Sequence, residues 1–133
     1  MGGTIRTFRR ETRAYIEKRL NELCKGIADA HGAEIKIEFD LVNKYPPTIN
    51  SKEETKFAAN VAKDLVGDDK VITDIDPSMG GEDFSYLLEK KPGSYLYLGQ
   101  GDAEHSAHLH TTKYDFNDNL LPIGVNFWVD LVQ

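Results

Sequence analysis

Three segments of the chain repeat their apolar residues with the period of an α-helix. They cover residues 9–30, 51–66 and about 117 or 118 to 132, and in each the apolar positions return every three or four residues. That spacing lines one face of a helix, so each segment is predicted to be a helix that is buried along this face. The three apolar faces consist of Ile16, Leu20, Leu23 and Ile27; of Phe57, Val61 and Leu65; and of Leu121, Val125, Trp128 and Val132.

Residues that commonly start or end helices lie at the ends of these three segments. Gly32 and Gly67 follow the first two segments and are predicted to end them, because glycine tolerates the left-handed backbone that closes many helices. Ser51 and Glu54 match a capping box, in which the serine side chain accepts a backbone N–H of the first turn. Pro122 falls in the first turn of the last helix, where backbone N–H groups have no partner within the helix anyway.

Four shorter segments have the composition of β-strands. Residues 34–40 alternate strictly between apolar and charged side chains, as in a strand with one wet face. Residues 4–8 and 70–74 are predicted to be short strands. Residues 94–98 are almost wholly apolar or aromatic, which is typical of a central strand. A tight turn at residues 80–83 leads into a further short helix.

The predicted order is therefore β-α-β, a linker, and then α-β-α-β-α. Pro46 and Pro47 exclude helix and make residues 44–50 a stiff linker. We place the boundary between two subdomains at about residues 44–51. Strands and helices that alternate along a chain indicate an α/β or α+β fold.

Composition indicates a globular protein. The 133 residues are 40% apolar, which is enough to predict one domain with a sizeable buried core. The net charge of −6 and the lack of a dense basic block argue against nucleic acid as a partner. No apolar run is long enough to span a membrane, and the first residues lack the apolar segment of a signal peptide. We therefore expect a soluble cytoplasmic protein.

The single cysteine adds one constraint. Cys24 has no second cysteine with which to form an intrachain disulfide, so nothing points to an oxidising compartment. It falls on the apolar face of the first helix, which predicts a buried thiol.

Three of the four histidines lie within six residues, at His105, His108 and His110. In an extended segment His108 and His110 point the same way, and two imidazoles on one face can bind zinc or another transition metal. His105 adds a third candidate ligand. The alternative is a polar loop that is rich in histidine, and the spacing matches no closed structural zinc motif.

The turn at residues 80–83 carries two carboxylates, Glu82 and Asp83, at the start of a helix. Their negative charge is favourable near the positive end of the helix dipole, which needs no further function. The other interpretation is a loop that faces a substrate, since α/β proteins tend to bind ligands in loops that follow strands. The chain contains no nucleophile elbow, phosphate-binding glycine loop or zinc-protease motif.

Several motifs taken together resemble one known family. The chain is similar to the C-terminal part of metal-dependent amidohydrolases of the aminoacylase and carboxypeptidase type, in the branch of hippurate hydrolases, N-acyl-amino-acid amidohydrolases and auxin-conjugate hydrolases. The resemblance covers essentially all 133 residues, with the motifs in the family's order. The motifs are GGTIRTF (2–8), YPPTIN (45–50), GGEDFSYLL (80–88), PGSYLYLG (92–99) and LHTTKYDFND (109–118).

This resemblance implies a division into two domains. Residues 1–44 resemble the second half of an α+β lid domain, which usually mediates dimerisation. Residues 45–133 resemble the end of an α/β catalytic domain that contains a two-metal centre. A homo-oligomer is therefore expected, with no nucleic acid and no membrane as partners.

The resemblance also assigns candidate site residues. The family's last metal ligand falls on His110, while His105 and His108 are only accessory candidates. Gly81, Glu82 and Asp83 resemble a loop close to the substrate. The metal implied is zinc, manganese or nickel. Thr111 and Thr112, directly after His110, depart from the family's usual Ser-Pro.

The family's other metal ligands and its general base come from an upstream part that has no counterpart here. The implied function is thus that of a fragment of an N-acyl-amino-acid amidohydrolase, which hydrolyses amides such as hippurate in the whole enzyme and is inactive alone. One alternative is a non-catalytic module for oligomerisation or assembly. Another is one half of an enzyme that a separate chain completes.

Overall fold

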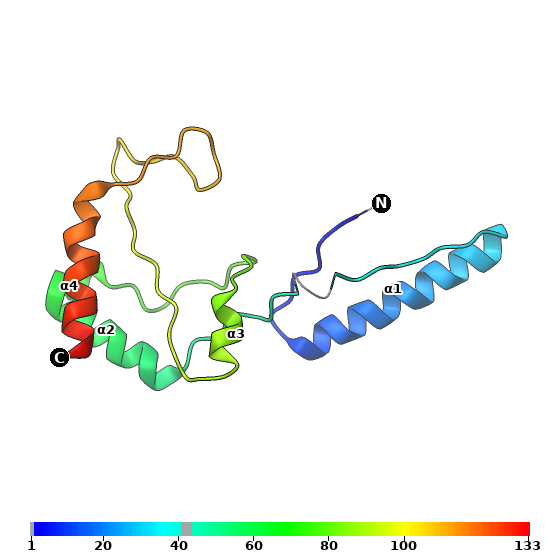
Figure 1. The fold of residues 1–133 in the computed structure, drawn as a ribbon, viewed down its shortest axis with the longest axis horizontal. Coiled ribbons are helices and arrows are strands. Elements are labelled where there is room, and N and C mark those ends of the chain that lie inside the picture. Colours follow the sequence, from blue (N-terminus) through cyan, green and yellow to red (C-terminus); the bar gives the residue numbers. More distant parts are fainter. Residues whose placement is uncertain (1, 41–43) are drawn as a thin grey trace. The chain divides into compact units, whose positions relative to one another are not determined.

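A computed structural model describes residues 2–40 and 44–133 of the chain (Figure 1). Its regular elements, in order, are α1 (Arg10–His31), α2 (Lys52–Val66), the 3₁₀ turn η1 (Asp68–Lys70), α3 (Phe84–Leu88), the 3₁₀ turn η2 (Asp118–Leu120) and α4 (Leu121–Val132). All four predicted helices are thereby confirmed. None of these helices, within the described part of the chain, combines the length and apolar composition needed to cross a membrane.

The chain divides into two compact units. The first consists of Met1–Ile49 and Asp76–Lys91, and the second of Asn50–Ile75 and Pro92–Gln133. The predicted lid and catalytic domains, 1–44 and 45–133, rest on the family resemblance and stay a prediction. Residues 1 and 41–43 of that predicted lid lie outside the described residues.

The glycines end their helices as predicted. Gly32 adopts the left-handed conformation with φ of 60° after α1, and the next N–H, from Ala33, donates to the carbonyl oxygen of Ala28 at 2.9 Å. Gly67 ends α2 with φ of 94°. Both positions have positive φ, which disfavours residues with a Cβ.

The prediction of a capping box at the start of α2 is wrong. Ser51 is the N-cap residue, but its side chain makes no capping hydrogen bond. Its Oγ instead accepts the backbone N–H of Gly93 at 3.1 Å, and the carbonyl oxygen of Gly93 accepts the N–H of Ser51 at 2.9 Å. The serine therefore ties α2 to residues 92–98, a contact distant in sequence that a local motif cannot predict.

The four predicted strands form no β-ladder within the described residues. Residues 4–8, 34–40 and 94–98 carry no regular secondary structure, and only Lys70 of residues 70–74 lies in an element, the turn η1. A strand is held by hydrogen bonds to a neighbouring strand, and these segments do not pair with one another. The α/β fold class stays a prediction, because it requires a sheet that these residues do not assemble by themselves.

The buried core is much smaller than predicted. Among the described residues, the apolar side chains that are almost fully covered are three alanines: Ala28 at 8% exposed, Ala58 at 4% and Ala59 at 7%. The larger apolar side chains stay partly or mostly in contact with solvent. The expectation of a sizeable core is therefore wrong for this chain by itself.

The apolar helix faces that were predicted to be buried are also partly exposed to solvent. On α1, Leu23 is 51% exposed and Ile27 is 54% exposed, and on α4 Trp128 is 65% exposed. Cys24 is half-buried rather than buried, for the same reason. The period of these residues is helical as predicted, but the described chain supplies no layer that covers them.

In the second unit, α2 packs against α4 (Figure 1). The best-covered side chains of α2 itself are Ala58 and Ala59, whereas Phe57 of the predicted face is more than half exposed. Val61 and Leu65 of the predicted face are half-buried, so the best-covered side of α2 includes part of that face together with the two alanines. Leu98 also lies over α4, because a Cβ at Gly124 would be 3.8 Å from its Cδ2.

Candidate functional site

The histidine loop belongs to the second unit and is held at both ends by Gln100. The Gln100 Nε2 donates to the carbonyl oxygens of His105 at 3.3 Å and Asp115 at 3.1 Å. Its Oε1 accepts the hydroxyl of Tyr114 at 3.3 Å and the backbone N–H of Asn117 at 3.4 Å. One side chain thus bridges the start and the end of the loop.

Asn117 closes the same network from the other side. It is one of two well-buried polar residues in the described chain, at 8% exposed. Its Nδ2 donates to the carbonyl oxygen of Gln100 at 3.4 Å and to Asp102 Oδ2 at 3.1 Å. Its Oδ1 accepts the N–H of Asn119 and begins η2. The buried amide therefore joins the loop to the start of the last helix.

Asp102 organises the first half of the loop. Its Oδ1 accepts the backbone N–H of Glu104 at 2.9 Å and of His105 at 2.7 Å, and lies 2.8 Å from His105 Nδ1. The N–H of His105, followed by its imidazole, lowers the pKa of this carboxyl below its ordinary value. The imidazole of His105 is thus engaged with Asp102 through its Nδ1.

His110 has an unusual backbone. Its φ of 63° makes it the one residue other than glycine with positive φ in the described part of the chain. A left-handed conformation costs a residue with a Cβ about 1–2 kcal/mol, and such conformations cluster at ligand clamps and active sites. No glycine or other local signal in the sequence points to this feature.

The predicted alignment of His108 and His110 is wrong. It assumed an extended backbone, but Leu109 and His110 lie in a turn. The hydroxyl of Thr111 donates to the carbonyl oxygen of His108 at 2.8 Å, and the N–H of Tyr114 donates to that of Thr111 at 3.2 Å. Both histidines are exposed on this turned segment.

The three histidines do not form a metal site with one another. Across the residues that the structure describes, no three His, Cys, Asp or Glu side chains converge in a group that can hold a metal ion. His105 is already bonded to Asp102, which leaves His110 and His108 as exposed imidazoles. The donor set present therefore does not fit a two-metal centre, and we derive no chemical step through a metal.

The turn at Gly81, Glu82 and Asp83 belongs to the first unit, whereas His110 belongs to the second, so each is described by itself. A Cβ at Gly81 would lie 2.9 Å from Arg6 Nη1 and 3.1 Å from the ring of Tyr45. Only glycine allows these side chains to pack so closely on the turn.

The two carboxylates of this turn differ in their surroundings. Glu82 Oε1 accepts the N–H of Phe84 at 3.2 Å, and its carbonyl oxygen accepts the hydroxyl of Ser85, which is fully buried, at 2.6 Å. Glu82 therefore helps to begin α3, as the first of the two interpretations expected. Asp83 is exposed and makes no capping bond. A role toward substrate stays a prediction for both.

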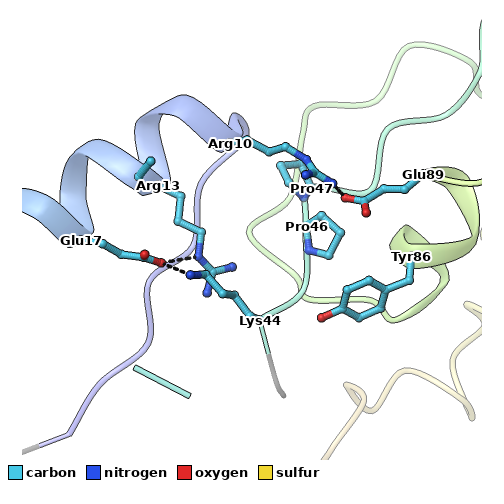
Figure 2. Close-up of a pocket in the computed structure, with 9 residues that line it drawn as sticks. Arg10, Arg13, Glu17, Lys44, Pro46, Pro47, Tyr86 and Glu89 are labelled. Atoms are coloured by element: carbon cyan, nitrogen blue, oxygen red, sulfur yellow. Dashed lines mark hydrogen bonds and ion pairs between the residues drawn. The ribbon is translucent and has the colours of Figure 1, made fainter. Parts of the chain in front are cut away.

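The first unit also contains an open pocket of about 350 Å³, bordered by several charged side chains, that the sequence did not reveal (Figure 2). Lys44 Nζ lies 2.7 Å and Arg13 Nε 3.0 Å from Glu17 Oε1, and Arg10 pairs with Glu89. Its walls are Arg10, Arg13, Ala14, Glu17, Lys44, Pro46, Pro47, Tyr86 and Glu89.

The charges in this pocket serve to fix the chain. The hydrogen bond from Lys44, together with that from Arg13, lowers the pKa of Glu17. Arg13 Nη1 also donates to the carbonyl oxygen of Tyr45 at 3.2 Å, and the Tyr45 ring meets that of Tyr86 edge-on at 5.9 Å. Because each cation already has a carboxylate partner, the cluster joins the first turns of α1 to residues 44–47 and to α3.

Comparison with known proteins gives a family match over nearly the whole chain. Residues 4–133 match Peptidase family M20/M25/M40. The chain is 36% identical over 96% of its length to a hippurate hydrolase of Campylobacter jejuni and covers 32% of that protein. It is 35% identical over 93% of its length to an N-acetyldiaminopimelate deacetylase of Lactobacillus helveticus, of which it covers 31%.

A plant relative is matched with a similar identity and a similar share of its length. The chain is 33% identical over 93% of its length to the IAA-amino acid hydrolase ILR1-like 2 of Arabidopsis thaliana and covers 28% of it. The chain thus spans about a third of the length of the curated relatives that it matches. No solved structure matches it.

The Asp102 network predicts a pH dependence for the loop. Because the folded-state pKa of Asp102 is lowered, its stabilising effect is complete above the ordinary aspartate pKa of about 3.9 and is lost as the pH falls through the lower folded value. In a pH titration followed by NMR, the amide N–H groups of Glu104 and His105 should stay protected from exchange down to that range and lose protection below it.

The matched control is Asp102→Asn, which stands in for the uncharged carboxyl at every pH and should therefore protect the two N–H groups less than the wild-type carboxylate does. Its amide protection should not respond to acid. Protection of Glu104 and His105 that decays in both proteins at the same pH would contradict the role given to Asp102.

Proposed function

Because this chain belongs to Peptidase family M20/M25/M40, we propose that it is the C-terminal part of a metal-dependent N-acyl-amino-acid amidohydrolase. The family match over residues 4–133 is the observation that carries this proposal. The names of its relatives refer to hippurate, to conjugates of IAA with amino acids and to N-acetyldiaminopimelate. The first is an amide of an acyl group with an amino acid, so the proposed reaction of the whole enzyme is hydrolysis of such an amide in a small substrate.

His110 is the residue that we propose as a metal ligand in the whole enzyme. Its exposed imidazole and its left-handed backbone support this role. An imidazole ligand suits zinc and nickel, and manganese is the third metal that the family resemblance implies. His108 stays an accessory candidate, and His105 is a weaker one because Asp102 holds its Nδ1. Gly81, Glu82 and Asp83 are proposed to lie near the substrate.

The chain alone is proposed to be inactive. Hydrolysis at a two-metal centre needs two ions held in place, a polarised carbonyl group and an activated water. Among the described residues no group of three metal-binding side chains exists, and one imidazole does not replace such a group. The activity therefore requires the ligands and the general base of the rest of the family's chain.

A direct test uses the purified 133-residue chain with zinc, manganese or nickel. We expect no metal-dependent release of glycine from hippurate, and calorimetry should find at most weak metal binding that His110→Ala leaves within about twofold. His108→Ala is the matched control for loss of an exposed imidazole. Hydrolysis of hippurate that disappears in His110→Ala would overturn the proposal of an inactive chain.

A second candidate function is assembly, favoured by the exposed apolar side chains of α1. Leu20, Leu23 and Ile27 line one face of this helix and are all at least a third exposed. Together with Ile16 they repeat at spacings of four, three and four, the pattern of helices that pair along a seam. We propose that this face pairs copies of the chain in a homo-oligomer in the cytoplasm, without nucleic acid or membrane as partners.

Light scattering of a charged variant tests the assembly proposal. Leu23→Glu places a carboxylate on the α1 face and should shift the chain from dimer or larger species toward monomer, with at least a tenfold weaker self-association. Asn21→Glu adds the same charge on the other side of α1 and should leave the oligomer intact. A wild-type chain that stays monomeric at high concentration would refute this candidate.

A further inference from the structure

The last helix is apolar on nearly every side. Of the twelve residues of α4, only Asn126 and Asp130 have polar side chains. A helix that is hydrophobic all round belongs in the interior of a protein, between two layers. The composition of α4 therefore predicts that protein packs against two opposite faces of the helix, and in the described part of the chain only one of these faces is packed.

The covered face lies against the rest of the second unit. Ile123, Phe127 and Leu131 recur every four residues and are half-buried, and α4 packs on α2. Leu98 lies beside Gly124 on the flank of the same helix.

The opposite face has no cover in the described chain. Its members follow the spacing of four, three and four residues and are each more than half exposed, up to 81% at Val132. We call this face the α4 stripe, which consists of Leu121, Val125, Trp128 and Val132. Apolar side chains gathered on one exposed face mark an interaction surface when they form a continuous patch.

Residues 94–98 of the same unit also have apolar side chains that stay exposed to solvent in the described chain. Leu96, Tyr97 and Leu98 are exposed, although the composition of this segment is that of a strand buried on both faces. The backbone of Tyr95 is engaged by the Asn50 side chain, at 2.8 Å to its N–H and 2.9 Å to its carbonyl oxygen. The second unit therefore has both an exposed helix face and a strand-like segment whose apolar side chains are exposed.

We propose that the α4 stripe docks onto the polypeptide that makes up the other two-thirds of the family's chain. This inference rests on the proposed function and names the partner that completes it. The chain covers about a third of its relatives, so the family possesses the additional chain that an apolar layer over α4 requires. Asp130 is the only charged residue of α4, so the complementary surface is apolar rather than charged.

A second copy of this chain is a poor occupant of the stripe. The twelve residues of α4 span about 18 Å and a helix is about 10 Å wide, which gives a footprint on the order of 200 Å². Stable protein pairs bury about 800 Å² of each partner. Pairing of two α4 helices alone falls short of this area, whereas a folded body built from twice as much chain can cover the stripe and residues 94–98 together.

Trp128 is the only tryptophan of the chain, which makes it a specific reporter for the stripe. The experiment labels the full 133-residue chain with 5-fluorotryptophan and mixes it with the part of the Campylobacter jejuni hippurate hydrolase that lies outside its matched third. That preparation is used once it has been shown to bind the relative's own matched third. We expect a complex in which the ¹⁹F resonance of Trp128 shifts and loses its solvent isotope effect.

Charged variants then locate the contact. Val125→Lys and, separately, Val132→Lys should each weaken the complex at least tenfold while the helix content of the chain stays unchanged. Ile75→Lys is the matched control, because Ile75 is 61% exposed in the same unit but outside both the stripe and the predicted strands; it should bind as the wild type does.

Three results would overturn the inference. One is a complex in which the Trp128 resonance is unchanged, because docking would then use another surface. Another is a resonance that changes with the concentration of this chain alone, because a second copy would then cover the stripe. The third is the absence of any complex. A complex formed through the stripe that lacks metal-dependent hippurate hydrolysis would instead leave the docking intact and remove the proposed function.

Discussion

The structure depends on how little apolar surface the chain can bury by itself. Hydrophobic burial is the dominant favourable contribution to folding, and a fully buried leucine, valine or phenylalanine contributes about 1.5–3 kcal/mol. The well-covered apolar side chains of the described residues are alanines, while Leu23, Ile27 and Trp128 are more than half exposed. The described residues have the apolar composition of a globular domain, but they do not supply the surfaces against which their larger apolar side chains would pack.

What holds each unit together is therefore largely local or polar. The ion pairs of Glu17 with Arg13 and Lys44 fix the start of α1, and Ser51 joins α2 to Gly93. Gln100, Asp102 and Asn117 hold the histidine loop through hydrogen bonds. His110 thus lies on a defined turn with an exposed imidazole, which is consistent with the ligand role proposed for it.

The sequence predicted local features well because their causes are local. The helical period of the apolar residues and the glycines at 32 and 67 located the helices and two of their ends. The family resemblance, carried by short motifs, is confirmed by the match over residues 4–133. These features need no knowledge of what lies across from them.

Features that depend on distant residues were missed. The apolar period identified the face of α4 that is expected to be buried, but it did not show whether this chain contains a surface that packs against that face. Ser51 bonds with Gly93 rather than within its own helix because residues 92–98 happen to pass there. The left-handed backbone of His110 and the bridging role of Gln100 depend on the closure of a whole loop. No pattern of spacing in the sequence encodes such contacts.

The most direct test of this account is the heat-capacity change on unfolding of the isolated chain, kept monomeric during calorimetry. A compact domain of this length exposes apolar surface that gives about 12–15 cal/mol/K per residue, or about 1.6–2.0 kcal/mol/K in total. We predict a value below half of this, with a broad transition, because few apolar side chains are buried to begin with. A sharp transition with the full heat-capacity change would mean that the chain builds a complete core by itself, and it would contradict the claim that a partner surface is required.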